Sequence, residues 1–481
     1  MKNKKNENFS EWFTEITQEA ELCDLRANIK GFIVNMPWAV MTMKRMYALY
    51  EAELERRGHL PTLFPSLIPE SFLKTESEHV EGFIPEVFWV THAGDKKLEE
   101  RYAMRPTSET IMYKIYSLWV QGLKDLPLKI YQSVPMWRCE TKATRPFIRG
   151  REVWWIEAHD VFATREQAEQ QVREDMEMTE TIMHQQFGIP FVFFQRPQWD
   201  KFPGAENTYA ADCLMPDGKI VQQPSTHMLG QKFSKAFDIK FMDENGKLQY
   251  AWQTCYGPAI WRIYASLISQ HGDDKGLIMP FSLAPMQIII VPIFKKENET
   301  VVRDKSYKIK QMLLQAGFRV DADFSGQTPG SKFYKWEMKG VPIRIEIGEK
   351  EANSGILTLA RRDNSTKEQV EESKLIAKMT DLQEMIRKNL VSKADDYFLS
   401  KFFSANTKEE LREQLKKGGF VRIPFCSIDV DGKKCADEIK AETVADIRGV
   451  PFDSNEKPKF GESCIHCGKP AKFYVYAGRQ Y

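Results

Sequence analysis

The chain has 481 residues, enough for roughly two to four domains, and its 42% apolar and 28% charged residues are typical of a globular protein. A formal net charge of +1 excludes a protein that binds polyanions through overall charge, so any contact with nucleic acid requires a local basic face. No apolar run is long enough to span a membrane, and the polar start MKNKKNENFSEWF lacks the apolar segment of a secretion signal. We therefore expect a cytoplasmic protein whose eight cysteines are thiols or metal ligands.

Helical signals dominate the start of the chain. An amphipathic helix is expected within the first 27 residues, and apolar residues recur at helical spacing from Pro37 to Arg57, where Gly58 ends the pattern. The following run, HLPTLFPSLIP, is strand-like, but its prolines place it at a sheet edge or an interface. A third helix, TIMYKIYSLWV, follows RPTSET, in which Thr107 or Ser108 can cap the first turn.

Antiparallel hairpins are predicted in the middle of the chain. LMPDGKIVQQ and KFMDENGKLQYAWQ each place an Asp-Gly or Asn-Gly turn between two strand-like runs. Neither the G-x-G-x-x-G loop nor the Walker A loop of parallel nucleotide-binding sheets occurs. A site for ATP in this chain would therefore lie on an antiparallel sheet.

The pattern changes near residue 284, where strand-like runs such as IIIVPI and VPIRIEIG alternate with helical segments at 301–316 and 332–339. This alternation predicts an α/β domain of about 100 residues. The charged segment EQVEESKLIAKMTDLQEMIRKNL is interpreted as a surface helix or linker, and the residues after it form a small unit with four of the cysteines.

The stretch that carries most chemistry is SVPMWRCETKATRPFIRGREVWWIEAHDVFA, residues 133–163. It predicts a strand that ends at Arg138 and Glu140, then a cationic loop and a returning strand. Guanidinium groups grip phosphate oxygens bidentately and keep their charge at any working pH, so the pattern suits a nucleoside triphosphate. An exposed hairpin with a solvated basic loop is the alternative, and three tryptophans argue against it, namely Trp137, Trp154 and Trp155.

This stretch resembles motif 2 of the class II aminoacyl-tRNA synthetases, and RPFIRGRE with the closing E-x-H is similar to the prolyl enzymes of archaeal and eukaryotic type. The segment at about 45–70 resembles motif 1, which forms the dimer interface in that family, and the segment at about 255–283 resembles motif 3. The resemblance implies an α+β protein with three parts: a class II antiparallel-sheet catalytic domain over 1–283, an α/β anticodon-binding domain over 284–390 and a small C-terminal zinc-binding domain over 391–481.

The resemblance also implies how ATP is held. Amino acid activation crowds negative charge around one phosphorus, so the site needs positioned cations. Arg138 would meet the α-phosphate and the amino acid carboxylate, and Glu140 the adenine side. Arg149 and Gly150 lie where the family's loop closes over the nucleotide.

A second arginine is implied by motif 3, whose helix holds the γ-phosphate in this family. Arg262 takes that position, although four residues separate it from Gly257, whereas many relatives have three. A surface arginine on an ordinary helix is the alternative.

The amino acid pocket is implied by Thr107, Ser108 and Glu109, which match the TSE loop that contacts the amino acid in class IIa enzymes. A secondary ammonium needs an acceptor, and Glu109 can provide its carboxylate. A well-capped helix without further function is the competing interpretation, because the same residues suit a helix start.

QQPSTHMLGQKFSKAFDI resembles a family segment that contacts both substrates, and it places Gln222 and Ser225 at ATP and His227 in the amino acid pocket. No proton transfer is assigned to the histidine, because the attacking carboxylate is already ionised. Two departures from the family, Val153 for a phenylalanine and Ala158 for a glycine, are expected to reshape the pocket modestly.

The domain after residue 284 resembles the class IIa anticodon-binding domain, and TPGSKFYKWEMKGVPIRIEIG is close to the version found in prolyl enzymes. Glu337 and Arg344 are the candidates for reading bases. The run mixes cations with aromatic rings, which suits stacking of unpaired bases beside phosphates: Lys332, Phe333, Lys335, Trp336 and Arg344. A core aromatic pair with solvated lysines is the alternative.

Four cysteines near the C-terminus have the spacing of metal ligands. Cys464 and Cys467 form a C-x2-C knuckle followed by glycine, a common structural zinc half-site, and Cys426 and Cys435 form a looser pair. Four neighbouring thiolates would repel one another, and a bound metal relieves that repulsion. The resemblance implies structural zinc here; His466 is a less favoured ligand, and four ordinary thiols are the alternative.

The resemblance implies an aminoacyl-tRNA ligase that activates L-proline with ATP, with Mg²⁺ accompanying the phosphates, and then esterifies the 3′ end of tRNA(Pro), as a homodimer. Two alternatives stay open. Another class IIa synthetase is opposed by RPFIRGRE and by the four-cysteine unit. A non-catalytic tRNA-binding or regulatory paralogue would be expected to lack Arg138, Glu140 or Arg262, and all three are present.

Overall fold

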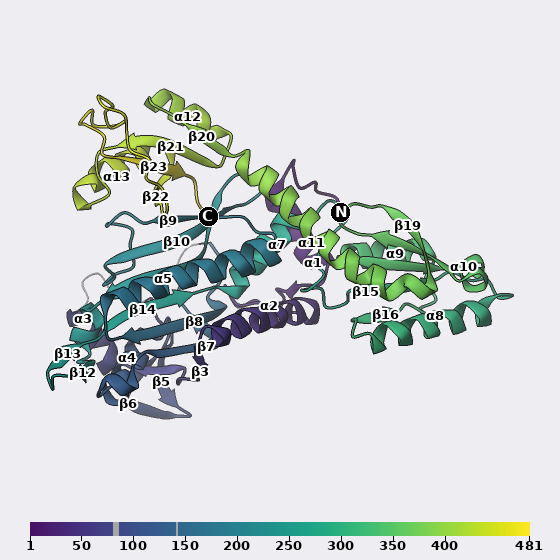
Figure 1. Cartoon of the computed structure of the whole chain (residues 1–481), viewed down its shortest axis with the longest axis horizontal. Helices are drawn as coiled ribbons and strands as arrows, with labels where there is room; N and C mark the ends of the chain where they lie inside the picture. The colour runs from purple at the N-terminus through teal and green to yellow at the C-terminus, as the bar shows by residue number, and fades with distance from the viewer. Residues whose placement is uncertain (80–85, 141–142) are drawn as a thin grey trace.

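The computed structural model describes residues 1–79, 86–140 and 143–481. The predicted cationic loop includes residues 141 and 142, which lie outside this description. Figure 1 shows a sheet-rich body at the lower left, a smaller body at the right and the C-terminal body, in yellow, above the first. The long helix α11 (Leu375–Leu399) runs from the right-hand body to the C-terminal one. No helix among the described residues is long and apolar enough to cross a membrane.

An antiparallel sheet forms the centre of the first body, as the hairpin pattern predicts. Its strands run in the order β9-β10-β11-β14-β8-β7-β3, and only β3 and β7 pair in parallel. The proline-rich run after Gly58 supplies β3 and therefore lies at the sheet edge, as predicted. The strands are β3 (Leu60–Pro61), β7 (Leu128–Trp137), β8 (Glu152–Phe162), β9 (Val192–Gln195), β10 (Asn207–Leu214), β11 (Ile220–Gly230) and β14 (Trp252–Gly257).

Helices cover this sheet. α2 begins at Pro37, whose missing N–H costs nothing in a first turn, and ends before Gly58, whose φ is +87°. α5 lies across β8, β11 and β14, and α2 packs on α7 (Figure 1). The helical segments are α1 (Phe9–Glu19), α2 (Pro37–Arg56), α3 (Glu70–His79), α4 (Glu109–Trp119), η1 (Leu123–Asp125), α5 (Arg165–Thr179), η2 (Glu180–Gln186), α6 (Lys232–Ala236) and α7 (Ile260–His271).

Three small sheets complete the first body. Their strand orders are β1-β2, β4-β6-β5 and β12-β13, and the sheet of β12 and β13 is the second predicted hairpin. Their strands are β1 (Cys23–Asp24), β2 (Val34–Asn35), β4 (Leu67–Pro69), β5 (Trp89–Ala93), β6 (Lys96–Met104), β12 (Lys240–Met242) and β13 (Leu248–Tyr250).

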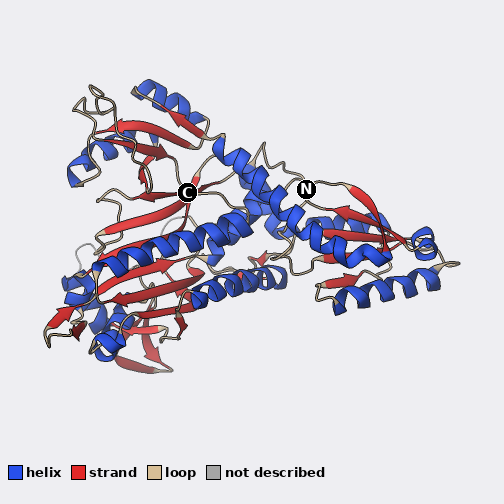
Figure 2. Ribbon diagram, in the orientation of Figure 1, coloured by secondary structure: helices blue, strands red, loops and turns tan. Residues whose placement is uncertain are grey.

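The right-hand body is α/β, as its alternating pattern predicts. Its sheet has the order β16-β15-β17-β18-β19, and Figure 2 shows helices packed around it. The elements are β15 (Ile288–Pro292), α8 (Glu299–Gln315), β16 (Val320–Ala322), α9 (Pro329–Met338), β17 (Ile343–Ile347), α10 (Glu349–Ser354), β18 (Ile356–Arg361), β19 (Lys367–Glu371), η3 (Glu372–Lys374) and α11.

The prediction of one charged surface helix after residue 367 is wrong at its start. Residues 367–371 form β19, because Val370 pairs with Leu357 of β18 and enters the core. Burial of that side chain outweighs the poor strand propensity of its glutamate and glutamine neighbours. The helix itself is more than a linker, since Leu382, Ile386 and Leu390 pack into the same core.

The C-terminal body continues the sheet of the first body. β22 (Asp446–Pro451) pairs with β9, so the sheet extends through β23, β21 and β20 to eleven strands. Gly449 makes this junction close: its φ is +117°, and a Cβ there would lie 1.9 Å from the carbonyl oxygen of Gln195. The other elements are β20 (Phe402–Ser404), α12 (Lys408–Lys416), β21 (Phe420–Phe425), η4 (Val430–Gly432), α13 (Lys433–Thr443) and β23 (Phe473–Gly478).

Gly449→Ala is expected to destabilise the protein by about 2–3 kcal/mol, because a methyl group adds a backbone clash to the strain of positive φ. Gly461→Ala is the matched control, since Gly461 also has positive φ but a Cβ there meets nothing within 4 Å. Thermal unfolding of both variants measures the difference. Equal midpoints for the two variants would show that β22 does not need the close approach at Gly449.

Candidate active site

One cavity of about 260 Å³ lies on the antiparallel sheet of the first body. Strands β7, β8, β11 and β14 line it, together with the segment before α4 and the first turn of α7. Seven of the residues predicted to bind substrates meet there although they come from four separate stretches of the chain: Thr107, Glu109, Arg138, Gln222, Ser225, His227 and Arg262.

The start of α4 faces this cavity and is not a side-chain cap. Ser108 occupies the N-cap position, but its side chain makes no capping hydrogen bond. Its hydroxyl instead donates to Glu157, and the hydroxyl of Thr107 donates to the carboxylate of Glu109. The expected cap is therefore wrong, and the polar groups of this turn are directed to the site.

Strand β8 forms a wall of the cavity. Val153, Trp155, Glu157 and His159 all line it, because alternate side chains of a strand point to one face. Ala158 points the other way, into the hydrophobic core, so it does not shape the cavity as expected. Of these residues, the sequence predicts only Val153 at the pocket. The period of two in V-x-W-x-E-x-H was the available signal for the other three.

Glu157 and His159 form a buried ion pair. The carboxylate lies 3.3 Å from Nε2 of the histidine, and Gln132 donates to the same carboxylate at 2.7 Å. Burial alone would raise the pKa of Glu157, but His159, Ser108 and Gln132 outweigh it and lower that pKa. Burial alone would lower the pKa of His159, and the neighbouring carboxylates raise it instead. Both shifts favour the charged form of the group concerned, so the two side chains stabilise each other as an ion pair.

His227 stays neutral in the cavity. Burial is the first cause, and the charges of His159 and Arg196 add to it, so the pKa of His227 falls to about 3. Its ring nitrogens lie within hydrogen-bonding distance of the hydroxyls of Thr208, at 2.8 Å, and Ser225, at 3.1 Å. A neutral imidazole that contacts two hydroxyl groups can orient a substrate, but it does not act as an acid at neutral pH.

Arg138 and Arg262 place two guanidinium groups at the cavity, where Arg138 is exposed and Arg262 is partly buried. Arg138 donates from Nε to the carbonyl oxygen of Pro106 at 3.2 Å, and its guanidinium lies 5.6 Å from the ring centre of Trp155. Arg262, in the first turn of α7, donates to the backbone oxygen of Gln222 at 3.1 Å. Burial, with the charge of Arg138, lowers the pKa of Arg262 to about 10, so both arginines remain charged at neutral pH. Two neighbouring cations suit a polyanionic ligand.

The other predicted ATP contacts lie beside the cavity. Among the described residues, Glu140, Arg149 and Gly150 are outside its lining. Arg149 lies 3.9 Å from Glu140 and donates to the backbone oxygen of Tyr481 at 3.0 Å. Gly150 is pressed against Trp261, whose ring would meet a Cβ at 2.2 Å, so this loop residue is fixed by packing on α7.

The predicted base-reading residues of the second body lie together. Arg344 donates to Glu337 at 2.9 Å, and its guanidinium lies 3.9 Å from the ring centre of Phe333. Both residues line a cavity of about 160 Å³ that also carries Arg361, Arg362 and Lys367. Lys332 does not belong to this cationic face: it is 3% exposed and donates to the backbone of Asp323, contrary to the prediction.

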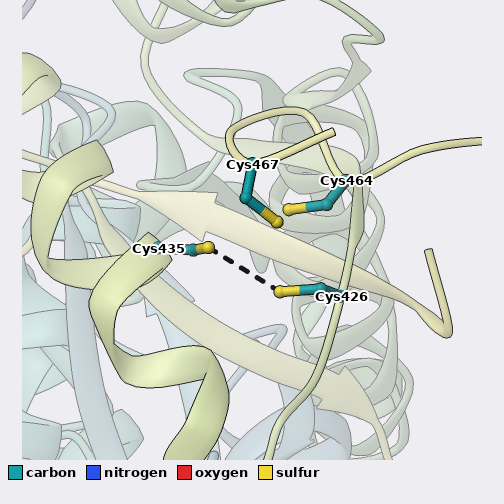
Figure 3. Close-up of side chains that lie close together, drawn as sticks. All are labelled: Cys426, Cys435, Cys464 and Cys467. Carbon is teal, nitrogen blue, oxygen red and sulfur yellow. Dashed lines mark hydrogen bonds between the residues drawn. The ribbon is translucent and has the colours of Figure 1, made fainter. Parts of the chain in front are cut away.

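The four C-terminal cysteines converge (Figure 3). Cys426 and Cys435 bring their sulfur atoms within 3.7 Å, and one sulfur from each of the four cysteines lies within 4.8 Å of the others. A tetrahedral zinc site with four sulfur ligands needs sulfur separations of about 3.8 Å, so the donor set and spacing fit this metal. His466 is not in the cluster, and its ring pairs with Glu438.

Glu109, His159 and Cys255 also place possible ligand atoms within 4.8 Å of one another. Both ring nitrogens of His159 are already engaged, by Glu157 and by the Tyr113 hydroxyl at 2.9 Å. Burial and the nearby carboxylates hold the pKa of Cys255 well above its usual range, so its side chain is a thiol. These donors suit an organic cation in the pocket better than a metal.

A buried acidic layer lies next to β8 and β11. Asp175 of α5 accepts hydrogen bonds from Gln171, at 2.8 Å, and Thr226, at 2.7 Å. Asp160, also fully buried, lies 3.2 Å from Nε2 of His59. Burial, and then the charge of Asp160, raise the pKa of Asp175 to about 7.

The chain matches three family models in order. They are described as tRNA synthetase class II core domain (G, H, P, S and T) over residues 88–271, anticodon binding domain over 287–382, and prolyl-tRNA synthetase, C-terminal, over 408–481. The sequence is 50% identical over 480 residues to the proline–tRNA ligase of Thermofilum pendens, which covers 99% of this chain and 98% of that protein. The chain belongs to the prolyl-tRNA synthetase family.

Two more relatives agree with this assignment to the prolyl-tRNA synthetases. The proline–tRNA ligase of Pyrococcus abyssi is 40% identical over 99% of this chain and 98% of its own length. A solved structure described as Giardia lamblia prolyl-tRNA synthetase in complex with prolyl-adenylate has a TM-score of 0.94 and 36% identity, over 99% of each chain. The family and the class II antiparallel fold predicted from residues 133–163 are confirmed.

Asp175→Asn is expected to remove a pH dependence of stability. Because the pKa of this carboxyl is raised on folding, the folded state binds more protons than the unfolded state between about pH 4 and pH 7, and the free energy of unfolding falls as the pH rises through that window. Relative to the wild type, the variant should therefore gain roughly 2–3 kcal/mol on going from pH 5 to pH 8. Chemical denaturation at the two pH values measures this.

The matched control is Asp238→Asn, whose side chain is 69% exposed and should change stability equally at both pH values. Parallel stability curves for Asp175→Asn and wild type would contradict the raised pKa.

Proposed function

We propose that this chain is the proline-activating ligase of its family. It condenses L-proline with ATP to prolyl-adenylate, releases pyrophosphate and transfers the prolyl group to the 3′ end of tRNA(Pro). The observation that carries the proposal is the meeting of Glu109, Arg138 and Arg262 in one cavity. A buried carboxylate for an ammonium group and two guanidinium groups at the cavity for a carboxylate and phosphates match the charges of the two substrates.

The proline half of the site is assigned to β8 and the turn before α4. Glu109 accepts a hydrogen bond from the hydroxyl of Thr107 and another from the secondary ammonium group of proline. Trp155 and His227 border the ring, and neutral His227 adds no charge to this apolar part. Arg138 holds the proline carboxylate, whose oxygen attacks the α-phosphorus of ATP. No general base is needed, since that carboxylate is already ionised.

The ATP half is assigned to Arg138, Arg262, Gln222 and Ser225, with Glu140, Arg149 and Gly150 closing from the neighbouring loop. Arg138 meets the α-phosphate, Arg262 the γ-phosphate and Glu140 the adenine side. The two arginines lower the energy of the transition state because negative charge on the phosphate oxygens grows as the new bond forms. Mg²⁺ bound to the nucleotide would neutralise part of this charge.

The second body is proposed to bind the anticodon. Glu337 and Arg344 read base edges there, and the cations beside them meet phosphates. The catalytic domain spans residues 1–283, the anticodon-binding domain 284–390 and the C-terminal zinc-binding domain 391–481. Cys426, Cys435, Cys464 and Cys467 hold one structural Zn²⁺, because four protein ligands leave no open position for chemistry.

A homodimer in the cytoplasm completes the proposal. The outer sheet edge at β3 carries exposed apolar side chains, and edge strands of this kind invite pairing with another chain. These side chains extend over β4 and the end of α4: Leu60, Leu63, Leu67, Leu118 and Trp119. A second copy of the chain would cover them.

Pyrophosphate exchange into ATP, tested across the twenty amino acids, is expected to respond to proline. Glu109→Gln should raise the KM for proline by about 30-fold or more, the loss of one charge-assisted hydrogen bond, and leave the KM for ATP nearly unchanged. Glu177→Gln, at a side chain that is 64% exposed on α5, is the matched control.

Exchange driven by another amino acid would make the chain a different class IIa synthetase. No exchange with any amino acid would favour a non-catalytic, tRNA-binding or regulatory paralogue.

The purified chain is expected to contain about one zinc ion, and Cys464→Ser should lose it and unfold at lower temperature. Cys139→Ser, at a cysteine outside the cluster, should keep the metal. Elemental analysis and thermal unfolding measure both. If the wild type contains no zinc and the Cys464→Ser variant is fully stable, the four cysteines are ordinary thiols and the zinc proposal is wrong.

A further inference from the structure

A buried group of three charges lies where the first and C-terminal bodies meet. The carboxylate of Asp212, on β10, is held by two guanidinium groups. Arg196 donates to its two oxygens at 2.9 and 2.6 Å, and Arg448 donates to the same two oxygens at 2.8 and 3.0 Å. None of the three residues is more than 1% exposed.

The two arginines come from different bodies of the structure. Arg196 directly follows β9 of the catalytic sheet, whereas Arg448 lies on β22, the C-terminal strand that pairs with β9. The backbone oxygen of Arg448 also accepts a hydrogen bond from Arg196, at 2.9 Å, and its side chain donates to Gln480 at 2.7 Å. The fold therefore inserts a guanidinium of the C-terminal body behind the cavity.

One arginine would suffice to pair with this carboxylate, and the second faces the more distant carboxylates of Asp200 and Asp446. Taking charged groups out of water is costly even when they are paired, so stability alone is a weak reason for the group. Burial would raise the pKa of Asp212, but the two arginines hold it at about 2, so the carboxylate is ionised. The group reaches the cavity through Arg196, which lines it together with Asp200.

The group is linked to the predicted ATP contacts. Arg196 donates to the side-chain oxygen of Gln222 at 3.3 Å, and Arg262 donates to the backbone oxygen of the same glutamine at 3.1 Å. Gln222 is thus held from two sides, by Arg262 at its backbone and by Arg196 at its amide. The side chain of Arg448 reaches Arg196 through Asp212, because both guanidinium groups donate to the same two carboxylate oxygens.

We propose that Arg448 is a positioning residue for ATP: the C-terminal domain completes the nucleotide half of the active site by fixing Arg196 and, through it, Gln222. Arg448 itself touches no substrate, since it is not among the residues that line the cavity. This inference rests on the proposed function, because it takes Gln222 as an ATP contact.

The experiment uses the full-length, zinc-loaded chain with Arg448→Gln, Arg448→Lys and the control Arg422→Gln. Arg422 lies on β21 of the same body, but its partner there is Glu456. The readouts are the KM values for ATP and for proline in pyrophosphate exchange, with zinc content and the thermal midpoint for each variant.

Arg448→Gln is expected to raise the KM for ATP by about tenfold, less than the loss of a direct charge-assisted hydrogen bond because Arg448 acts through Arg196, and the KM for proline by less than about twofold. Arg448→Lys keeps the charge but loses the fork, so its KM for ATP should fall between those of wild type and Arg448→Gln. Arg422→Gln should match the wild type in both constants.

A folded, zinc-loaded Arg448→Gln variant with an unchanged KM for ATP would overturn the inference, as would equal rises in both KM values. If Arg448→Gln does not fold, Gln480→Ala loosens the same guanidinium from its far side and should raise the KM for ATP alone; an unchanged constant there also overturns it. Absence of proline-dependent exchange in the wild type would instead contradict the proposed function.

Discussion

The pleat of β8 is the constraint on which the active site depends. In an antiparallel strand, successive side chains must leave on opposite faces, so one stretch of chain can wall a cavity and fill a core at the same time. Trp155, Glu157 and His159 line the cavity, while Ile156 and Ala158 complete the core beneath. A shift of one residue in the pairing of β8 with β7 would bury both charges in that core and put the apolar side chains at the substrates.

The charged side chains of this candidate site are held in place before any substrate arrives. Glu157 pairs with His159, Glu109 accepts from Thr107, and Arg262 is anchored on the backbone of Gln222. Each hydrogen bond fixes a side chain that would otherwise have to be ordered during the reaction, and this preorganisation is how fixed dipoles and charges lower a barrier. Adenylate formation needs no general base in addition, because its nucleophile, the carboxylate of the amino acid, is already an anion.

Sequence reasoning found the parts of this protein whose signals are local. Arg138, Glu109 and Arg262 stand in short motifs, the hairpins carry their own turn residues, and the cysteine knuckle has a fixed spacing. Antiparallel pairing, the α/β second body and the cysteine cluster followed from such signals.

What escaped prediction depends on contacts between distant residues. Asp212 gives no sign in sequence that Arg448, 236 positions away, will pair with it. Ser108 suits a helix cap by type, but Glu157 on another strand takes its hydroxyl. Val370 lies in a strand and not in the predicted helix because it pairs with Leu357 of β18 in the core. Lys332 is buried because its ammonium group donates to the backbone oxygen of Asp323. Local propensity cannot register partners that only the tertiary fold supplies.

The eleven-stranded sheet also determines what removal of the C-terminal body would expose. A domain that is simply appended can be removed at its linker, but here β22 covers the hydrogen-bonding edge of β9. A chain cut after residue 390 would leave that edge of the catalytic sheet open to water and to other chains, which is the usual origin of edge-to-edge aggregation. The C-terminal body thus covers a sheet edge that would otherwise be open to pairing with other chains, a task independent of both metal and substrate.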